Sequence, residues 1–190
     1  MAQQLPVVLT LDLASTTGWC CGRLGEQPRF GAWFLGAGPY GDRYRTLADR
    51  MADKLRIQET SGQPVTECCF EAPLARQQKT VATARVLMGL AAIAEYVASR
   101  FALKVTEAHV GQTRAAVLGQ SRFARGANVK AEIDRLCQLQ GWNIPQPDAR
   151  DAFVLWQHVQ LVRVPRLAAA PGAFRPRLPM RLETPSLPGL

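Results

Sequence analysis

The chain has 190 residues, of which 47% are hydrophobic, so it can bury the core of one compact α/β domain but is too short for two full-sized ones. Its 23 Lys and Arg against 15 Asp and Glu give a net charge of +8, which is common among proteins that neutralise phosphates but does not establish nucleic-acid binding. The five cysteines have no CxxC spacing, which argues against a zinc site. The N-terminus has no basic region ahead of an apolar run, and no segment approaches the roughly 18 consecutive apolar residues of a membrane helix. We therefore expect a soluble, cytoplasmic protein.

The first part of the chain predicts short strands around one helix. Residues 7–13 (VVLTLDL) are β-branched and Leu-rich, which indicates a central buried strand. Two short apolar runs separated by turn residues indicate the next two strands of an antiparallel meander. Apolar residues at helical spacing then predict an amphipathic helix, which is followed by a strand that ends before Pro73. The expected strands are 7–13, 19–24, 30–35 and 65–71, with a helix over 40–58.

The second part predicts helices separated by one strand. The expected helices are 80–101, 112–118, 128–139 with a cap at or beside Asn128, and 148–162, and the expected strand is 103–110. A β-β-β-α-β-α-β order followed by helices predicts an α/β fold with a mixed five-stranded sheet flanked by helices. Residues 1–162 would form this single domain. Residues 163–190 are rich in Pro and Arg and predict a basic, disordered tail.

Four carboxylates fall at notable positions on these elements. Asp12 lies within the first strand, Glu71 ends the fourth, and Asp148 and Asp151 are one turn apart on the last helix, so these two face the same way. Each has an ordinary structural alternative. Asp12 would pair with a buried Arg, Glu71 would simply terminate its strand, and Asp148 and Asp151 would be an N-cap and an N3 residue that favour the helix dipole. Taken together, the four predict one shared metal site, because clustered carboxylates beside an apolar core repel one another unless cations bind.

The acids lie in three recognisable segments: LDLASTTGW around Asp12, CFEAPL around Glu71, and DARDAFVLWQH around Asp148 and Asp151. These segments resemble the acidic motifs of the RuvC family of Holliday junction resolvases, most of all its phage and prophage-like members. The resemblance covers roughly residues 7–162, and the DxxDA segment is its most specific part. It implies a ribonuclease H-like fold, a homodimer, and paired cuts across a four-way DNA junction that leave 5′-phosphate ends.

The chain departs from the family pattern at two places. Bacterial members typically have Asp-Pro-Gly after the first strand, whereas this chain has Asp12-Leu13-Ala14-Ser15, so the turn must be built differently. They also carry an aromatic residue shortly after the second-motif glutamate, proposed to stack at the junction centre. This chain has Ala72-Pro73-Leu74 there, so that stretch offers no aromatic for the stacking role.

The predicted chemistry needs two hard divalent cations, Mg²⁺ or Mn²⁺, held by carboxylate oxygens. One ion activates the attacking water and the other stabilises the leaving 3′ oxygen. Asp12 is the expected bridging ligand, and Glu71, Asp148 and Asp151 complete the two shells. The resemblance places Lys130 where the family has a catalytic lysine near the scissile phosphate, with a solvated helix lysine as the alternative.

Several basic residues are expected to contact the DNA backbone. They are Arg76, Lys79, Arg114, Arg122, Arg125 and Lys130. Phe123, between two of them, would stack on a base or be a plain loop hydrophobe. The Ala-rich helix over residues 81–96 packs on its own sheet or forms a two-fold interface, and we favour the interface because junction resolution needs two sites.

Other interpretations remain open. The segment from Asp12 to Gly18 also resembles the first phosphate loop of the actin and sugar-kinase superfamily, whose members repeat the domain within one chain, which 190 residues cannot accommodate. A second alternative is a ribonuclease of the same fold that acts on structured RNA. A third is a junction-binding protein without catalysis, which the presence of all four acids disfavours.

Overall fold

The computed structural model describes residues 4–73, 80–119, 128–139 and 141–165. Its strands are β1 (Val7–Asp12), β2 (Thr16–Arg23), β3 (Arg29–Phe34), β4 (Glu67–Glu71) and β5 (Lys104–Ala108). Its helices are α1 (Tyr40–Thr60), α2 (Val81–Arg100), α3 (Val110–Leu118), α4 (Val129–Leu139) and α5 (Pro147–Arg163). This order confirms the predicted succession of elements.

The strands form one mixed sheet in the order β3-β2-β1-β4-β5. Strands β1, β2 and β3 are an antiparallel meander, whereas β1 pairs with β4, and β4 with β5, in parallel. β1 is therefore central, and its first five residues are buried, as expected of a strand covered on both faces. The predicted α/β class and five-stranded mixed sheet are confirmed.

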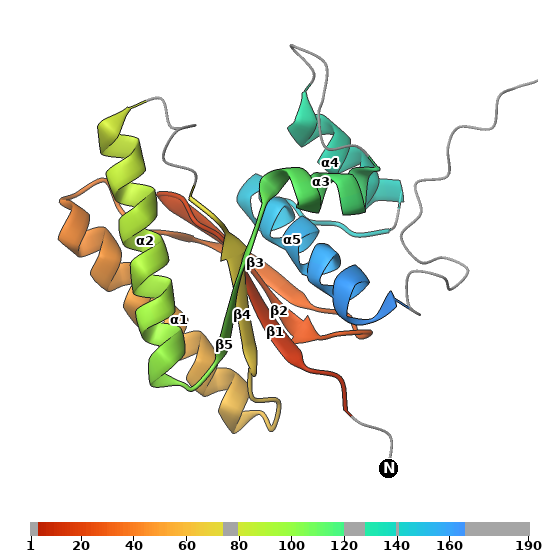
Figure 1. Cartoon of the computed structure of the whole chain (residues 1–190), viewed down its shortest axis with the longest axis horizontal. Helices are drawn as coiled ribbons and strands as arrows, with labels where there is room; N and C mark the ends of the chain where they lie inside the picture. Colours follow the sequence, from red (N-terminus) through yellow and green to blue (C-terminus); the bar gives the residue numbers. More distant parts are fainter. Residues whose placement is uncertain (1–3, 74–79, 120–127, 140, 166–190) are drawn as a thin grey trace, which may run out of the picture.

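Helices cover both faces of the sheet: α1 and α2 lie on one side, and α3, α4 and α5 on the other (Figure 1). Side chains of β1 alternate between the two layers because successive residues of a strand point to opposite faces. Leu9 and Leu11 join the core under α1 and α2, while Val8 joins Phe153 and Trp156 of α5 in the second core. The alternation leaves the end of β1 between the two helical layers.

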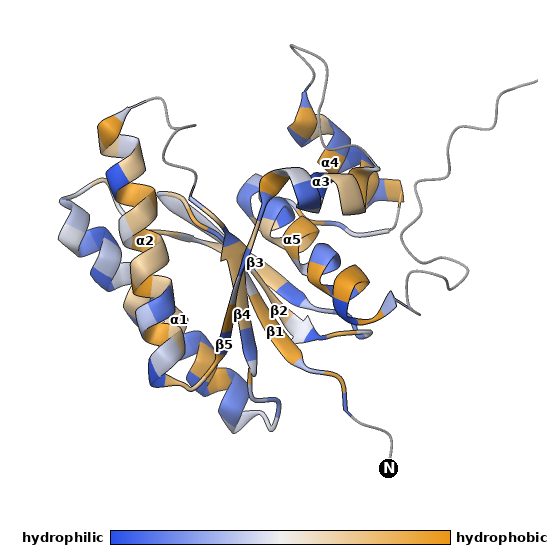
Figure 2. Cartoon of the chain, in the orientation of Figure 1, coloured by the Kyte–Doolittle hydropathy of each residue, from blue (hydrophilic) through white to orange (hydrophobic). Residues whose placement is uncertain are grey.

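The Ala-rich helix α2 packs closely on α1, as its small residues predict. A Cβ added to Gly89 would lie 2.2 Å from the Tyr44 hydroxyl, which donates a hydrogen bond to the Arg85 carbonyl oxygen at 3.1 Å. Figure 2 shows α2 pale to orange over most of its length. By length and a hydropathy of 1.5 it is the one helix of the described residues that qualifies as a membrane span, but core helices of soluble proteins pass the same test.

The element boundaries differ from the prediction by one to three residues. For example, β5 ends at Ala108 and α3 begins at Val110, within the predicted strand 103–110. β2 begins at Thr16, earlier than residue 19, because Thr16 and Thr17 pair with Phe34 and Trp33 of β3 despite their turn-like composition. α5 begins at Pro147, with Gln146 as its N-cap, and ends at Arg163. Most of the predicted tail, residues 166–190, lies outside the described residues.

Candidate active site

The ends of β1 and β4 bring the first two acids together. The parallel register pairs Leu11 with Phe70, so the residues that follow, Asp12 and Glu71, end neighbouring strands at the same edge of the sheet. This edge is formed by the carboxyl ends of parallel strands, where open α/β sheets bind their ligands. The two acids thus share an edge although the sequence separates them by a helix and two strands.

Helix α5 brings the other two acids to this edge because β2 has a glycine where the helix crosses it. Gly18 pairs with Asp12 across the β1–β2 ladder. A Cβ on Gly18 would lie 1.8 Å from the main-chain oxygen of Asp148, so only glycine allows this approach. One turn further on, the Thr10 hydroxyl donates to the Ala152 carbonyl oxygen at 2.8 Å and ties α5 to β1. Asp148 and Asp151 are thereby held over the end of the central strand.

The electrostatics show that the four acids influence one another. Burial, followed by the charges of Asp151, Glu71 and Asp148, raises the pKa of Asp12 from 3.8 to about 8. Burial also raises the pKa of Glu71 and that of Asp151. A desolvated carboxyl group surrounded by three others is unfavourable without a cation, and strongly shifted groups of this kind mark functional sites.

Two predicted basic residues lie beside these acids. The ammonium nitrogen of Lys130, on α4, is 3.6 Å from Asp151 Oδ2, and its charge offsets part of the burial-driven rise in the pKa of Asp151. The charge of Arg114, on α3, likewise offsets part of the rise in the pKa of Glu71 and of Asp151. The structure therefore gathers all six of the predicted site residues that it describes: Asp12, Glu71, Asp148, Asp151, Lys130 and Arg114.

Two structural alternatives do not fit this geometry. Asp148 is not the N-cap of α5, because Gln146 holds that position and Pro147 is the first helical residue, although Asp148 remains in the first turn, where the helix dipole favours a carboxylate. Asp151 accordingly falls in the second turn, where the helix dipole has little effect. Asp12 has no Arg or Lys within ion-pair distance among residues 4–73, 80–119, 128–139 and 141–165, so the buried-arginine explanation finds no support there.

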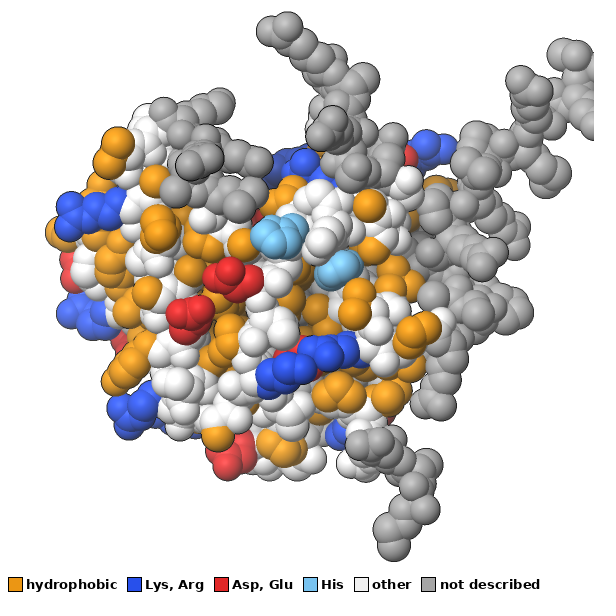
Figure 3. All heavy atoms as spheres, viewed as in Figure 1, with side chains coloured by type: hydrophobic (Ala, Val, Ile, Leu, Met, Phe, Trp, Pro, Cys, Tyr) orange, Lys and Arg blue, Asp and Glu red, His pale blue; other side chains and the backbone are white. Residues whose placement is uncertain are grey.

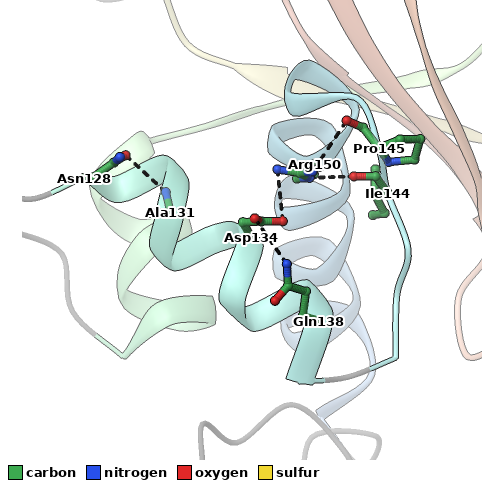
Figure 4. Close-up of polar contacts among 7 residues, drawn as sticks. All are labelled: Asn128, Ala131, Asp134, Gln138, Ile144, Pro145 and Arg150. Atoms are coloured by element: carbon green, nitrogen blue, oxygen red, sulfur yellow. Dashed lines mark hydrogen bonds and ion pairs between the residues drawn. The ribbon is translucent and has the colours of Figure 1, made fainter.

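Arg150 is a site residue that the sequence analysis missed. It lies between Asp148 and Asp151 in the sequence, and its side chain points toward Asp134 of α4 and the loop before α5 (Figure 4). Its guanidinium pairs with Asp134 of α4 at 3.0 Å and donates to the Ile144 carbonyl oxygen at 2.6 Å. Arg150 thus fixes the helix that carries Lys130. An arginine within an acidic motif was the available signal.

Helix α4 also has the N-terminal cap that the sequence predicts. The Asn128 side-chain oxygen accepts a hydrogen bond from the Ala131 amide at 3.1 Å (Figure 4). This cap sets the start of the turn that contains Lys130. Four other predicted DNA contacts, Arg76, Lys79, Arg122 and Arg125, and the stacking candidate Phe123 lie outside the described residues.

The donor set fits a hard divalent cation, since it consists of carboxylate oxygens around a desolvated centre. Across the part of the chain that the structure describes, however, no three His, Cys, Asp or Glu side chains are already at metal-site spacing. The four acids therefore lie near one another but farther apart than the ligands of a bound ion, and Lys130 contacts one of them, Asp151. A bound cation would draw the carboxylates together and offset their repulsion.

Surface charge locates the site less clearly than the buried acids do. On the face seen in Figure 3, the described Lys and Arg side chains are interspersed with acidic and apolar ones rather than joined in one basic patch. The net charge of +8 therefore does not by itself trace a path for DNA across this face.

Comparison with known proteins places the fold. No protein-family model and no curated protein matches the sequence. Among solved structures, that of Thermus thermophilus RuvC matches with a TM-score of 0.62 and 16% identity, covering 83% of this chain and 95% of that one. T. thermophilus RuvC in complex with a Holliday junction substrate matches with a TM-score of 0.63 and 13% identity, over the same shares of the two chains. The chain therefore has the ribonuclease H-like fold of RuvC, and the resemblance expected from its acidic motifs is borne out at the level of the fold.

Proposed function

We propose that this chain is a metal-dependent endodeoxyribonuclease that cuts four-way or other branched DNA. The observation that carries the proposal is a buried Asp12 with three other carboxyl groups nearby. Burial, followed by the charges of those three groups, raises the pKa of Asp12 to about 8. Such a site favours bound cations and has little value for stability. The fold of a protein whose solved complex contains a Holliday junction substrate supports DNA as the substrate class.

The proposed roles follow from where the side chains lie. Asp12, Glu71, Asp148 and Asp151 would hold the Mg²⁺ or Mn²⁺ ions through their carboxylate oxygens. When bound, such ions supply a nucleophilic water and stabilise the leaving 3′ oxygen. Lys130 and Arg114 place positive charge next to the acids and would orient the phosphate. Arg76, Lys79, Arg122 and Arg125 remain proposed contacts to the DNA backbone.

Resolving a four-way junction requires two cuts, so we propose that the protein acts as a homodimer. Val81, Met88 and Tyr96 of α2 are exposed by 88%, 53% and 56%, and their spacing puts them along one side of the helix. Exposed apolar side chains in a row support α2 as the two-fold interface. The opposite side of α2 is already buried against α1 and the sheet.

The deciding experiment measures cleavage of a synthetic four-way junction, a replication fork, a flap, linear duplex and structured RNA, with Mg²⁺ or Mn²⁺. We expect cuts in branched DNA that need either metal and leave 5′-phosphates, and a loss of at least 100-fold in Asp12→Asn. Intact substrates with both metals, or full activity in Asp12→Asn, would contradict the nuclease proposal. Cleavage of RNA alone would instead favour the ribonuclease, and tight junction binding without cutting would favour the non-catalytic protein.

A further inference from the structure

A pocket of about 510 Å³ opens at the turn that follows Asp12, and none of the four acids lines it. One wall is the turn of residues 13–15, which directly follows Asp12. The N-terminal ends of α1 and α2 form the others, with Tyr40 and Arg43 from the first helix and Val86 and Leu87 among the residues of the second. The pocket is therefore within one or two residues of the candidate catalytic centre along the chain.

The chemistry of the pocket combines an aromatic ring with positive charge. The guanidinium of Arg43, which lines the pocket, lies 5.9 Å from the centre of the Tyr40 ring. The guanidinium of Arg85, which contacts the same ring without lining the pocket, lies 5.1 Å from it. Both distances are within the range of a cation–π contact. Flat surfaces formed by a ring and a guanidinium bind the faces of nucleobases with little dependence on their sequence.

The two arginines differ in how firmly they are held. Arg43 donates to the carbonyl oxygens of Gly38 and Ala37, each at 3.1 Å, and lies 3.5 Å from the Ser15 hydroxyl. It therefore braces the loop between β3 and α1, and it reaches the turn after β1 through Ser15. Arg85 is exposed, and its guanidinium has no carboxylate partner in the described parts of the chain. Arg85 can thus move with a ligand, whereas Arg43 shapes the wall.

The α2 terminus adds a place for negative charge. Ala82 and Thr83 line the pocket within the first turn of this 20-residue helix. The Thr80 hydroxyl already accepts from the Thr83 amide at 3.0 Å, which leaves the amides of the first two helical residues without an intrahelical partner. Such amides and the helix dipole favour a phosphate.

We propose that this pocket receives one unpaired nucleotide of a branched DNA substrate, with its base stacked on the Tyr40–Arg85 pair and its phosphate near the start of α2. A base in intact duplex presents only its edges, so the pocket would select DNA whose bases are unstacked at a branch point. Tyr40 would then supply the aromatic that residues 72–74 lack. This inference rests on the proposed function, and it assigns to the pocket the discrimination between branched and linear DNA.

The test uses four-way junctions that carry the fluorescent base 2-aminopurine at each position around the branch point, bound by full-length protein with Asp12→Asn to prevent cutting. We expect the fluorescence of 2-aminopurine to change on binding at one or two positions. This change should be absent with Tyr40→Leu, smaller with Arg85→Gln and unchanged with Tyr40→Phe. Junction affinity should fall about 5- to 100-fold in Tyr40→Leu, while affinity for linear duplex stays unchanged.

Arg100→Gln is the matched control, since it removes the same charge from the other end of α2, roughly 20 Å away. Because Tyr40 also packs on the core, thermal melting must show that Tyr40→Leu is folded. If it is not, Arg85→Gln decides the question, once light scattering shows that it has the oligomeric state of the parent, because Arg85 lies one turn from Val81 and Met88 of the proposed interface. If junction affinity and the fluorescence change are the same in Tyr40→Leu, Arg85→Gln and the parent, the pocket proposal is wrong, while the proposed nuclease function is unaffected. Absence of any binding to branched DNA by the protein would reject both.

Discussion

Asp12 shows at the scale of a single residue how function opposes stability. It lies at the end of the central strand, partly buried, and its pKa is raised to about 8, first by burial and then by three other carboxyl groups. The unfolded chain would release this proton near pH 4. Between these two values the unfolded state is favoured increasingly as pH rises, so Asp12 makes the metal-free protein less stable at pH 8 than at pH 5.

We predict that Asp12→Asn stabilises the metal-free protein and that its gain in melting temperature grows as pH rises from 5 to 8, then levels off. At pH 8 the gain should be at least about 3 °C, because each 1 kcal/mol shifts the melting temperature by roughly 2–4 °C in a domain of this size. Thermal melts in a chelating buffer measure it. Saturating Mg²⁺ should reduce the difference in melting temperature between Asp12→Asn and the parent, since bound cations stabilise only the parent.

Asp49→Asn is the control for this experiment, because Asp49 is exposed on α1, away from the acid cluster. Its melting temperature should follow that of the parent at every pH. A destabilised Asp12→Asn, or a gain that does not depend on pH, would show that Asp12 is a paired structural acid after all.

At the scale of elements, the site depends on how closely α5 crosses the sheet. Gly18 permits the contact, since its missing side chain leaves room for the main-chain oxygen of Asp148. We predict that Gly18→Ala displaces the start of α5, lowers the melting temperature by several degrees and reduces cleavage by at least 10-fold.

The comparison variant is Gly41→Ala, where an added Cβ meets nothing within 4 Å. It should keep full activity and the parent melting temperature or a slightly higher one. Unchanged cleavage in Gly18→Ala would mean that the close contact does not position the acids.

Helix α4 depends in the same way on one ion pair. Arg150 joins α5 to Asp134 of α4, and Lys130 lies on α4 one turn earlier. We predict that Arg150→Gln loosens α4, which hydrogen exchange of the α4 amides would report as faster exchange. Cleavage should fall about 10-fold while metal dependence persists, because the acids remain in place.

Arg135→Gln provides the matched test. Arg135 makes only an exposed pair with Glu132, 3.7 Å away on the same helix, and such pairs contribute little. Equal exchange rates and equal cleavage for the two variants would argue that Arg150 has no special part in placing Lys130.

At the scale of the whole molecule, the assembly determines whether cuts are paired. If α2 forms the two-fold interface, Met88→Glu should convert the dimer into a monomer because it places a charge in an apolar contact. Light scattering measures the oligomeric state of each variant. On a cruciform plasmid, the parent should yield linear product, whereas Met88→Glu should yield mainly single nicks.

Ile57→Glu is the control at a site of similar exposure, 57% against 53%, on α1. It should remain dimeric and make paired cuts. A parent protein that is monomeric with DNA bound, or a dimer unaffected by Met88→Glu, would place the interface elsewhere or remove the dimer from the mechanism.

Much of the fold could be predicted from the sequence because local patterns carry it. Alternating or continuous apolar runs gave the strands, helical spacing gave the helices, and Asn128 gave the α4 cap, which the structure confirms. The boundaries shifted by one to three residues. At Thr16, pairing with β3 overrode turn-like composition, and α5 begins at Pro147 because proline suits the first position of a helix.

By itself, the sequence determined which acids the protein carries, on which elements, and in what order, and this was enough to predict the fold. Only the tertiary structure decided that Asp12, Glu71, Asp148 and Asp151 meet, since this depends on parallel pairing of β1 with β4 and on the space above Gly18. It also decided that Arg150 braces α4 and that Tyr40 lines a pocket at the turn that follows Asp12. The physical reason is that spacing along the chain specifies local conformation, whereas burial and charge proximity arise from contacts between residues far apart in it.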